Sequence, residues 1–207
     1  MRLGWLAVAA GVALLGWVTF NTLRADGVGS QGPPTGERMP PFAAPLALSR
    51  LDGDVNVARR GDEGGAGRRP ACTVRGRDVL NVCALYERGP VVLAFLVAGA
   101  ARCTHELDRL QRLRPHHRGV AFAAVAIRGD RGDLRATIRR HGWSFPVGYD
   151  RDGALANVYG VAVCPTVTFA LPGGVVQGTS LGELGSARLE ARVAALERAA
   201  RAGGWRP

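Results

Sequence analysis

Lysine is absent from this chain of 207 residues, so all 27 basic side chains are arginines. Isoleucine is nearly absent as well, and it occurs only at Ile127 and Ile138. Arginine, alanine and glycine have GC-rich codons, so base composition accounts for much of the formal net charge of +10. A charge of this origin is weak evidence for a polyanionic ligand, and we expect no nucleic-acid partner.

Cysteine is scarce too, with four residues in the whole chain. Four are too few for a scaffold in which disulfides replace a hydrophobic core. The hydrophobic share of 47% excludes a disordered chain, and no internal repeat is visible. Length and composition together indicate one folded domain with a core of its own.

Charge is missing altogether from residues 3–20. A helix of this length spans roughly 27 Å, which is just enough to cross the hydrocarbon core of a bilayer. The run is longer than the apolar region of a cleaved signal peptide, and a poor cleavage site follows it. Trp5 and Trp17 lie near its two ends, as interfacial aromatic residues do. We interpret residues 1–20 as an uncleaved signal anchor, a single transmembrane helix in the cell membrane, with a cleaved signal peptide as the alternative.

Both alternatives place the rest of the chain on the extracytoplasmic side, where cysteines meet an oxidising compartment. Residues 21–45 contain many glycine, proline and serine residues, which predicts a linker. Residues 46–203 then form the folded domain. Within it, residues 59–70 combine glycines, arginines and acids, as a solvated surface loop does.

The folded domain alternates between apolar runs and amphipathic segments. Residues 91–98 are almost continuously apolar, which is typical of a strand buried on both faces. The expected strands are residues 91–98, 119–127, 144–148, 167–171 and 175–178, and the expected helices are one around residues 103–113 and others at 133–141, 152–159 and 186–202. The strand–helix–strand order implies parallel central strands, and the last two strands form a hairpin. We predict an α/β fold with a central mixed β-sheet flanked by helices.

Three strings in this domain resemble a known family: FLVAGAARCTHEL at residues 95–107, FPVGYDRDGALANVYGV at 145–161 and YGVAVCPTVTFALPGG at 159–174. Over residues 41–202 the chain resembles the membrane-anchored TlpA/ResA-type thiol–disulfide oxidoreductases and the wider redoxin (AhpC/TSA-like) group. The resemblance implies a thioredoxin fold and no cofactor. It also implies, as partners, either protein thiols and disulfides or a membrane electron donor.

The catalytic motif of that family is altered in this chain. In the family, the helix after the first core strand begins with Cys-x-x-Cys, and a glutamate follows three residues later. The second cysteine corresponds to Cys103 and the glutamate to Glu106, but the first, nucleophilic position holds Ala100. A cysteine at that first position is activated by the free N–H groups and the dipole of the helix. With alanine there, the motif cannot perform ordinary two-cysteine exchange.

A replacement partner follows later in the chain. The family carries a cis-proline that corresponds to Pro165, and the residue before it, here Cys164, faces the catalytic position. The resemblance therefore leads to the hypothesis that Cys103 and Cys164 form a redox couple, with Glu106 as the third catalytic residue. Pro165 and Thr166 would line the substrate groove. The alternatives are a static disulfide or two buried free thiols.

The remaining two cysteines, Cys72 and Cys83, precede the first core strand. In an exported protein they most simply pair with each other as a structural disulfide. Four cysteines nevertheless allow three pairings, and sequence reasoning does not choose among them.

A peroxiredoxin-like peroxidase is a second function class. It would use Cys103 as its peroxidatic cysteine, because the string CTHE at residues 103–106 resembles the Cys-Thr-x-Glu of that group. The threonine and proline that precede this cysteine in peroxiredoxins are replaced by Ala100 and Leu96. The hydroxyl that activates peroxide is therefore missing.

A redox-inactive binding module is the third class. Such a protein keeps the groove beside Pro165 and holds a peptide or a folding client without redox chemistry. A metal centre of Cys103, His105 and Cys164 lacks the pattern of exported metallochaperones, which have two cysteines in the active-site loop and a distant histidine. We expect no metal.

Overall fold

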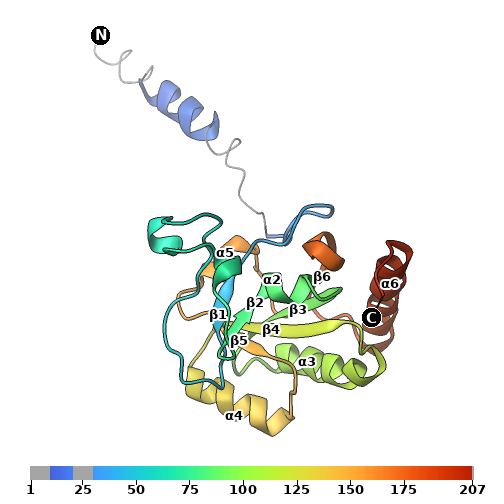
Figure 1. The fold of residues 1–207 in the computed structure, drawn as a ribbon. Helices are drawn as coiled ribbons and strands as arrows, with labels where there is room; N and C mark the ends of the chain where they lie inside the picture. The colour runs from blue at the N-terminus through green and yellow to red at the C-terminus, as the bar shows by residue number, and fades with distance from the viewer. Residues whose placement is uncertain (1–9, 21–29, 207) are drawn as a thin grey trace, which may run out of the picture.

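The computed structural model describes residues 10–20 and 30–206. A five-stranded sheet with the order β5-β4-β3-β6-β7 lies at its centre (Figure 1). Its strands are β3 (Val91–Val97), β4 (Ala121–Arg128), β5 (Val147–Tyr149), β6 (Thr166–Ala170) and β7 (Val176–Leu181). The first three run parallel to one another, and β6 and β7 are antiparallel additions. The predicted α/β fold with a central mixed sheet is confirmed.

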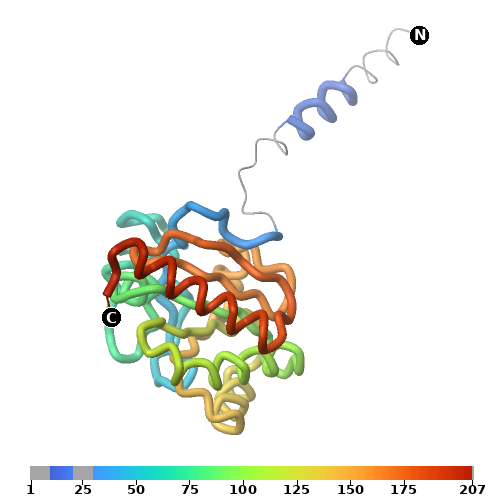
Figure 2. The backbone as a smooth tube through the Cα atoms, turned by 90° about the vertical axis from the view of Figure 1, so that its right-hand side faces the viewer, coloured from blue at the N-terminus to red at the C-terminus, as the bar shows by residue number. Residues whose placement is uncertain are grey.

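Helices cover both faces of this sheet, as Figure 1 and Figure 2 show. They are α2 (Val82–Tyr86), α3 (Ala101–Leu113), α4 (Arg131–His141), α5 (Ala154–Val158) and α6 (Ser186–Ala202). Short 3₁₀ turns are η1 (Gly64–Ala66), η2 (Ala71–Thr73), η3 (Arg114–His116) and η4 (Pro172–Gly174). Helices α3, α4 and α6 pack on one face, whereas α2 and α5 pack on the other.

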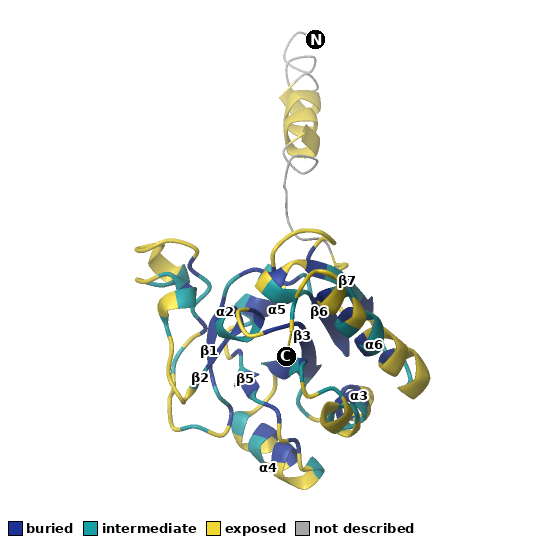
Figure 3. Cartoon of the chain, turned by 45° about the vertical axis from the view of Figure 1, so that its right-hand side comes forward, coloured by how far each residue is buried: buried dark blue, intermediate teal, exposed yellow. Residues whose placement is uncertain are grey.

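The central strand β3 shows why the sheet has two covered faces. Val92, Ala94 and Leu96 belong to the core under α3, α4 and α6, while the alternate residues Leu93 and Phe95 belong to the core under α2 and α5. Successive side chains of a strand point to opposite faces, so a strand between two layers needs apolar residues at every position. Figure 3 accordingly shows the central strands as buried and the outer helix faces as exposed.

The folded part begins earlier than the predicted boundary at residue 46. Strand β1 (Ala43–Pro45) pairs antiparallel with β2 (Val79–Asn81). Strand β1 lies within the predicted linker over residues 21–45, and β2 lies between Cys72 and Cys83. Met39 and Phe42 are fully buried on the α2/α5 face. Composition predicted a linker here because the apolar residues are isolated among prolines, and isolated residues have no periodicity to detect.

Residues 10–20 form a helix that carries exposed apolar side chains. No helix among the described residues is long and apolar enough to cross a bilayer. Residues 1–9, with which the predicted anchor begins, lie outside the described ranges. The anchor over residues 1–20 therefore stays a prediction.

Candidate functional site

The fold brings Cys103 and Cys164 to the same edge of the central sheet. Cys103 lies in the first turn of α3, which follows β3, and Cys164 lies two residues before β6. Phe95 near the end of β3 pairs with Thr166 at the start of β6, so the two connecting segments meet there. The structure joins the two cysteines by a disulfide with a Cα–Cα distance of 5.5 Å, and the Cys164–Pro165 peptide bond is cis.

The two sulfur-bearing residues differ in their access to solvent. Cys103 is 1% exposed and packs with Leu107 and Leu110 on the buried face of α3. Cys164 is only partly buried, and its Sγ accepts a hydrogen bond from the backbone N–H of Val97 at 3.2 Å. Cys164 is therefore the more accessible residue of this disulfide.

Ala100 occupies the N-cap position of α3 and makes no side-chain capping hydrogen bond. The carbonyl of Ala100 accepts the N–H groups of Cys103 and Thr104 as the helix begins. Because no side chain covers this N-terminus, its partial positive charge is directed at the sulfur of the first turn. Ala100, which the resemblance aligns with the family's nucleophilic cysteine, thus lies at the N-terminus of α3, and its assignment to that position stays a prediction.

Glu106 is fully buried one turn after Cys103. Its Oε2 forms an ion pair with Arg109 Nη1 at 2.6 Å, and its Oε1 accepts the N–H of Leu184 at 3.3 Å. Both carboxylate oxygens are therefore engaged, and they fasten α3 to the segment that precedes α6. Those contacts show Glu106 positioning the helix, and a direct catalytic role for it stays a prediction.

Two hydrogen bonds to backbone carbonyls hold the loop before β6. Thr166 Oγ1 donates to the carbonyl of Val163 at 2.7 Å, and Gly182 N–H donates to the carbonyl of Pro165 at 2.8 Å. Pro165 and Thr166 are themselves buried, whereas Val163 is 44% exposed. The accessible part of this loop is consequently residues 162–164, which directly precede the predicted groove residues Pro165 and Thr166.

Cys72 and Cys83 form the second disulfide, with a Cα–Cα distance of 5.3 Å. It connects η2 to α2, and both residues belong to the core under α2 and α5. Cys103 and Cys164 belong to the core on the opposite side of the sheet. The sheet therefore separates the two cysteine pairs.

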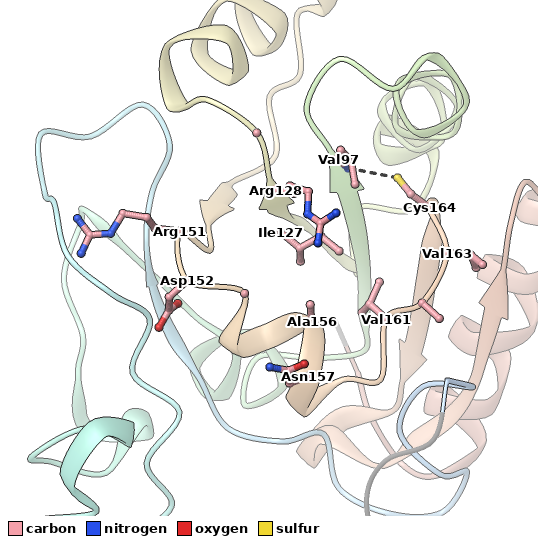
Figure 4. A pocket seen from close by; sticks show the side chains of 13 residues that line it. Val97, Ile127, Arg128, Arg151, Asp152, Ala156, Asn157, Val161, Val163 and Cys164 are labelled. Atoms are coloured by element: carbon pink, nitrogen blue, oxygen red, sulfur yellow. Dashed lines mark hydrogen bonds between the residues drawn. The ribbon is translucent and has the colours of Figure 1, made fainter.

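A pocket of about 450 Å³ opens beside Cys164. It is lined by the ends of β3 and β4, by residues 151–153 before α5, by Ala156 and Asn157 on α5, and by residues 161–164. Figure 4 shows the Arg128 side chain extending into this pocket, while Arg151 and Asp152 point away from its centre. Sequence reasoning missed the pocket because its walls come from four separate segments, although the string at residues 145–161 contains one of them.

Asp150 is a buried carboxyl group next to this pocket that the sequence also did not single out. Its Oδ2 accepts the backbone N–H groups of Leu155 at 2.9 Å and Ala156 at 3.3 Å, so it fastens the start of α5. Burial, followed by the neighbouring Asp152 carboxyl, raises the pKa of Asp150 from 3.8 to about 6.

Replacing Asp150 with asparagine should remove a pH dependence of stability. The unfolded carboxyl ionises near pH 3.8 and the folded one near pH 6, so between these values the unfolded state is stabilised as pH rises. We expect the free energy of unfolding of the unmodified protein to fall, relative to Asp150→Asn, by roughly 1–2 kcal/mol between pH 4 and pH 6.5. Urea unfolding across this range measures it, with Asp133→Asn at an exposed carboxylate as control. Parallel curves for the protein and Asp150→Asn would contradict the assignment.

No group of three or more histidine, cysteine or acidic residues is placed to hold a metal ion within residues 10–20 and 30–206. His105 is exposed on α3, and both sulfurs near it are in a disulfide.

The sheet order, the helices on both faces and the cis-proline next to a cysteine define a thioredoxin-fold protein. Residues 77–179 match the AhpC/TSA family, and this match together with a ResA relative supports a TlpA/ResA-like thioredoxin-fold protein. The chain is 28% identical over 102 residues to the thiol–disulfide oxidoreductase ResA of Oceanobacillus iheyensis, covering 48% of this chain and 53% of ResA. The chain thus spans about half the length of that curated relative.

Solved structures agree with this fold. A secreted Mycobacterium tuberculosis disulfide oxidoreductase homologous to E. coli DsbE superposes with a TM-score of 0.52 at 23% identity, covering 56% of this chain and 88% of that one. A thiol–disulfide oxidoreductase from Bacteroides fragilis superposes with a TM-score of 0.57 at 15% identity, covering 77% and 99%. At these identities the likeness shows the fold alone.

Proposed function

We propose that this chain is a thiol–disulfide oxidoreductase whose redox centre is the Cys103–Cys164 disulfide. The observation that carries the proposal is the position of this disulfide, which joins the first turn of α3 to the residue before the cis-proline. The names of ResA and of the two solved oxidoreductases support the same activity. In this proposed centre Cys164, from a different segment of the chain, takes the place of the cysteine that the family carries at the position of Ala100.

The chemistry requires a balanced exchange of two electrons. Two external thiols, or one substrate dithiol, reduce the Cys103–Cys164 disulfide to two protein thiols and leave as one disulfide, and in the reverse reaction the two protein thiols reduce a substrate disulfide and close again to Cys103–Cys164. Glu106 and Arg109 hold α3 so that Cys103 stays beside Cys164. We propose protein thiols and disulfides, or a membrane electron donor, as partners. The predicted anchor over residues 1–20 would keep the domain at the extracytoplasmic face of the cell membrane.

A redox titration of the full chain tests this function. The protein is equilibrated in thiol–disulfide buffers of different potential, free thiols are trapped by alkylation, and each cysteine is assigned by mass spectrometry. We expect Cys103 and Cys164 to interchange between thiol and disulfide while Cys72–Cys83 stays closed, because Cys164 lines a pocket beside the cis-proline and neither Cys72 nor Cys83 lines that pocket. The second disulfide is thus an internal control in the same molecule. If neither pair changes state over the accessible range, the proposed activity is wrong.

Ala100 favours one other function, a binding module that holds a partner without redox chemistry. A peroxidase is less well supported, because Cys103 is 1% exposed and no hydroxyl precedes it at Ala100. A silent redox titration together with retained capture of a peptide would favour the binding module. Consumption of hydrogen peroxide that depends on Cys103 but not on Cys164 would favour the peroxidase.

A further inference from the structure

The Cys103–Cys164 disulfide presents its two sulfurs unequally, and this asymmetry decides where an incoming thiol can react. Cys103 is 1% exposed, whereas Cys164 is partly buried and lines the pocket of about 450 Å³. Attack on Cys164 Sγ would release Cys103 as the thiolate. Cys103 lies in the first turn of α3, where the helix dipole stabilises a negative charge on the leaving sulfur. Access therefore favours attack at Cys164.

The three charged side chains that line this pocket differ in whether they are ion-paired and in where they point. Arg151 lines the pocket, but its guanidinium pairs with Asp54. Asp152 lines it too, and Figure 4 shows its carboxylate directed away from the pocket centre. Arg128 extends into the pocket in the same view, and no carboxylate among the described residues pairs with it. The pocket thus combines a reactive sulfur with one cationic group whose hydrogen-bond donors are open to a ligand.

We propose that the thiol that reduces this disulfide is a low-molecular-weight thiol bearing a carboxylate, which Arg128 binds while its sulfur attacks Cys164 Sγ. This inference rests on the proposed oxidoreductase function. A pocket of about 450 Å³ is within the size of small-molecule sites, and a guanidinium binds a carboxylate through paired hydrogen bonds. The order of attack differs from that expected of a Cys-x-x-Cys motif, in which the helix N-terminus carries the attacked cysteine.

The exchange proceeds in two displacements. The first thiolate forms a bond to Cys164 Sγ, the Cys103–Cys164 bond breaks, and Cys103 Sγ takes the electron pair. A second thiolate attacks the ligand sulfur of this mixed disulfide, so the small-molecule disulfide leaves and Cys164 becomes a thiolate. The N–H of Val97, which already donates to Cys164 Sγ at 3.2 Å, stabilises that charge. Two external thiols are oxidised and one protein disulfide is reduced, with the thiol protons passing to Cys103, Cys164 or solvent.

The test compares two probes, mercaptosuccinate as the carboxylate-bearing thiol and 2-mercaptoethanol as the uncharged one, on the oxidised full-length protein. We expect Arg128→Gln to slow reduction by mercaptosuccinate about tenfold and reduction by 2-mercaptoethanol much less, because both thiols attack as thiolates but only mercaptosuccinate carries carboxylates that the guanidinium can bind. Taking the ratio of variant to unmodified rate for each thiol cancels their different intrinsic reactivities. Arg139→Gln, which removes the same charge from an exposed position on α4, should change neither rate.

A second measurement locates the mixed disulfide without any variant. The reaction is quenched early with an alkylating reagent, and mass spectrometry should place mercaptosuccinate on Cys164 and the alkyl group on Cys103. Added salt should also weaken the preference for mercaptosuccinate in the unmodified protein, since it screens the exposed Arg128.

The outcomes separate this inference from the proposed function. Reduction by both thiols without any dependence on Arg128, or a mixed disulfide on Cys103, overturns the inference and leaves the oxidoreductase proposal standing. A much faster reaction with an acidic peptide thiol than with mercaptosuccinate overturns the choice of a small molecule. A Cys103–Cys164 disulfide that neither thiol nor dithiothreitol reduces overturns both.

Discussion

Cys103→Ser should lower the turnover of thiol–disulfide exchange to the rate of the reagents alone, and Cys164→Ser should do the same. Disulfide exchange moves two electrons, so a centre with one remaining sulfur stops at a mixed disulfide. The measurement is the reduction of insulin by dithiothreitol in the presence of each variant, with equal amounts of protein. Equal losses in the two variants are expected because the two sulfurs form one bond in the oxidised centre.

The matched control for this experiment is the double variant Cys72→Ala/Cys83→Ala, which removes the other disulfide of the same chain. Under conditions in which this variant is folded, it should keep the exchange activity, because the central sheet separates Cys72–Cys83 from the Cys103–Cys164 centre. Activity that survives Cys103→Ser but disappears in the double variant would transfer the redox centre to the α2 side of the sheet.

The same double variant should lower the free energy of unfolding by about 3 kcal/mol. Cys72 and Cys83 are separated by 11 positions, and a cross-link that closes a loop of this length reduces the conformational entropy of the unfolded chain by that amount. The linked segment includes β2, which pairs with β1, so the disulfide also holds the small second sheet against the core. Equilibrium unfolding in urea, monitored by circular dichroism, measures the loss.

Two comparisons control this stability experiment. Reduced unmodified protein, unfolded in the presence of dithiothreitol, should approach the stability of the double variant, apart from the contribution of Cys103–Cys164. The slope of the free energy against urea should rise slightly in the variant, since an unfolded chain without the cross-link exposes more surface. A loss below about 1 kcal/mol would mean that this disulfide has no structural role and that the packing of η2 on α2 is sufficient.

Much of the fold could be predicted because its signals are local. The periodicity of residues 186–202 predicted α6 with the bounds that the structure has, and the apolar run from Val91 predicted β3 to within one residue. Burial of β3 on both faces required apolar residues at consecutive positions, and that pattern is visible in the sequence itself. By contrast, β1 and the buried Met39 and Phe42 left no such pattern, since their burial comes from contacts with distant segments.

Some features of the candidate site likewise follow from the sequence alone, whereas others depend on the tertiary structure. The sequence by itself determined the family resemblance, the missing thiol at Ala100 and the candidacy of Cys164, because these are matters of residue identity at motif positions. Only the tertiary structure decided that Cys103 is shielded while Cys164 lines a pocket, and that Arg128 extends into it. Exposure and the pairing of charges depend on which segments meet at the edge of the sheet. That meeting is set by the register of β3 with β6 and by the packing of α5, across segments that are far apart along the chain.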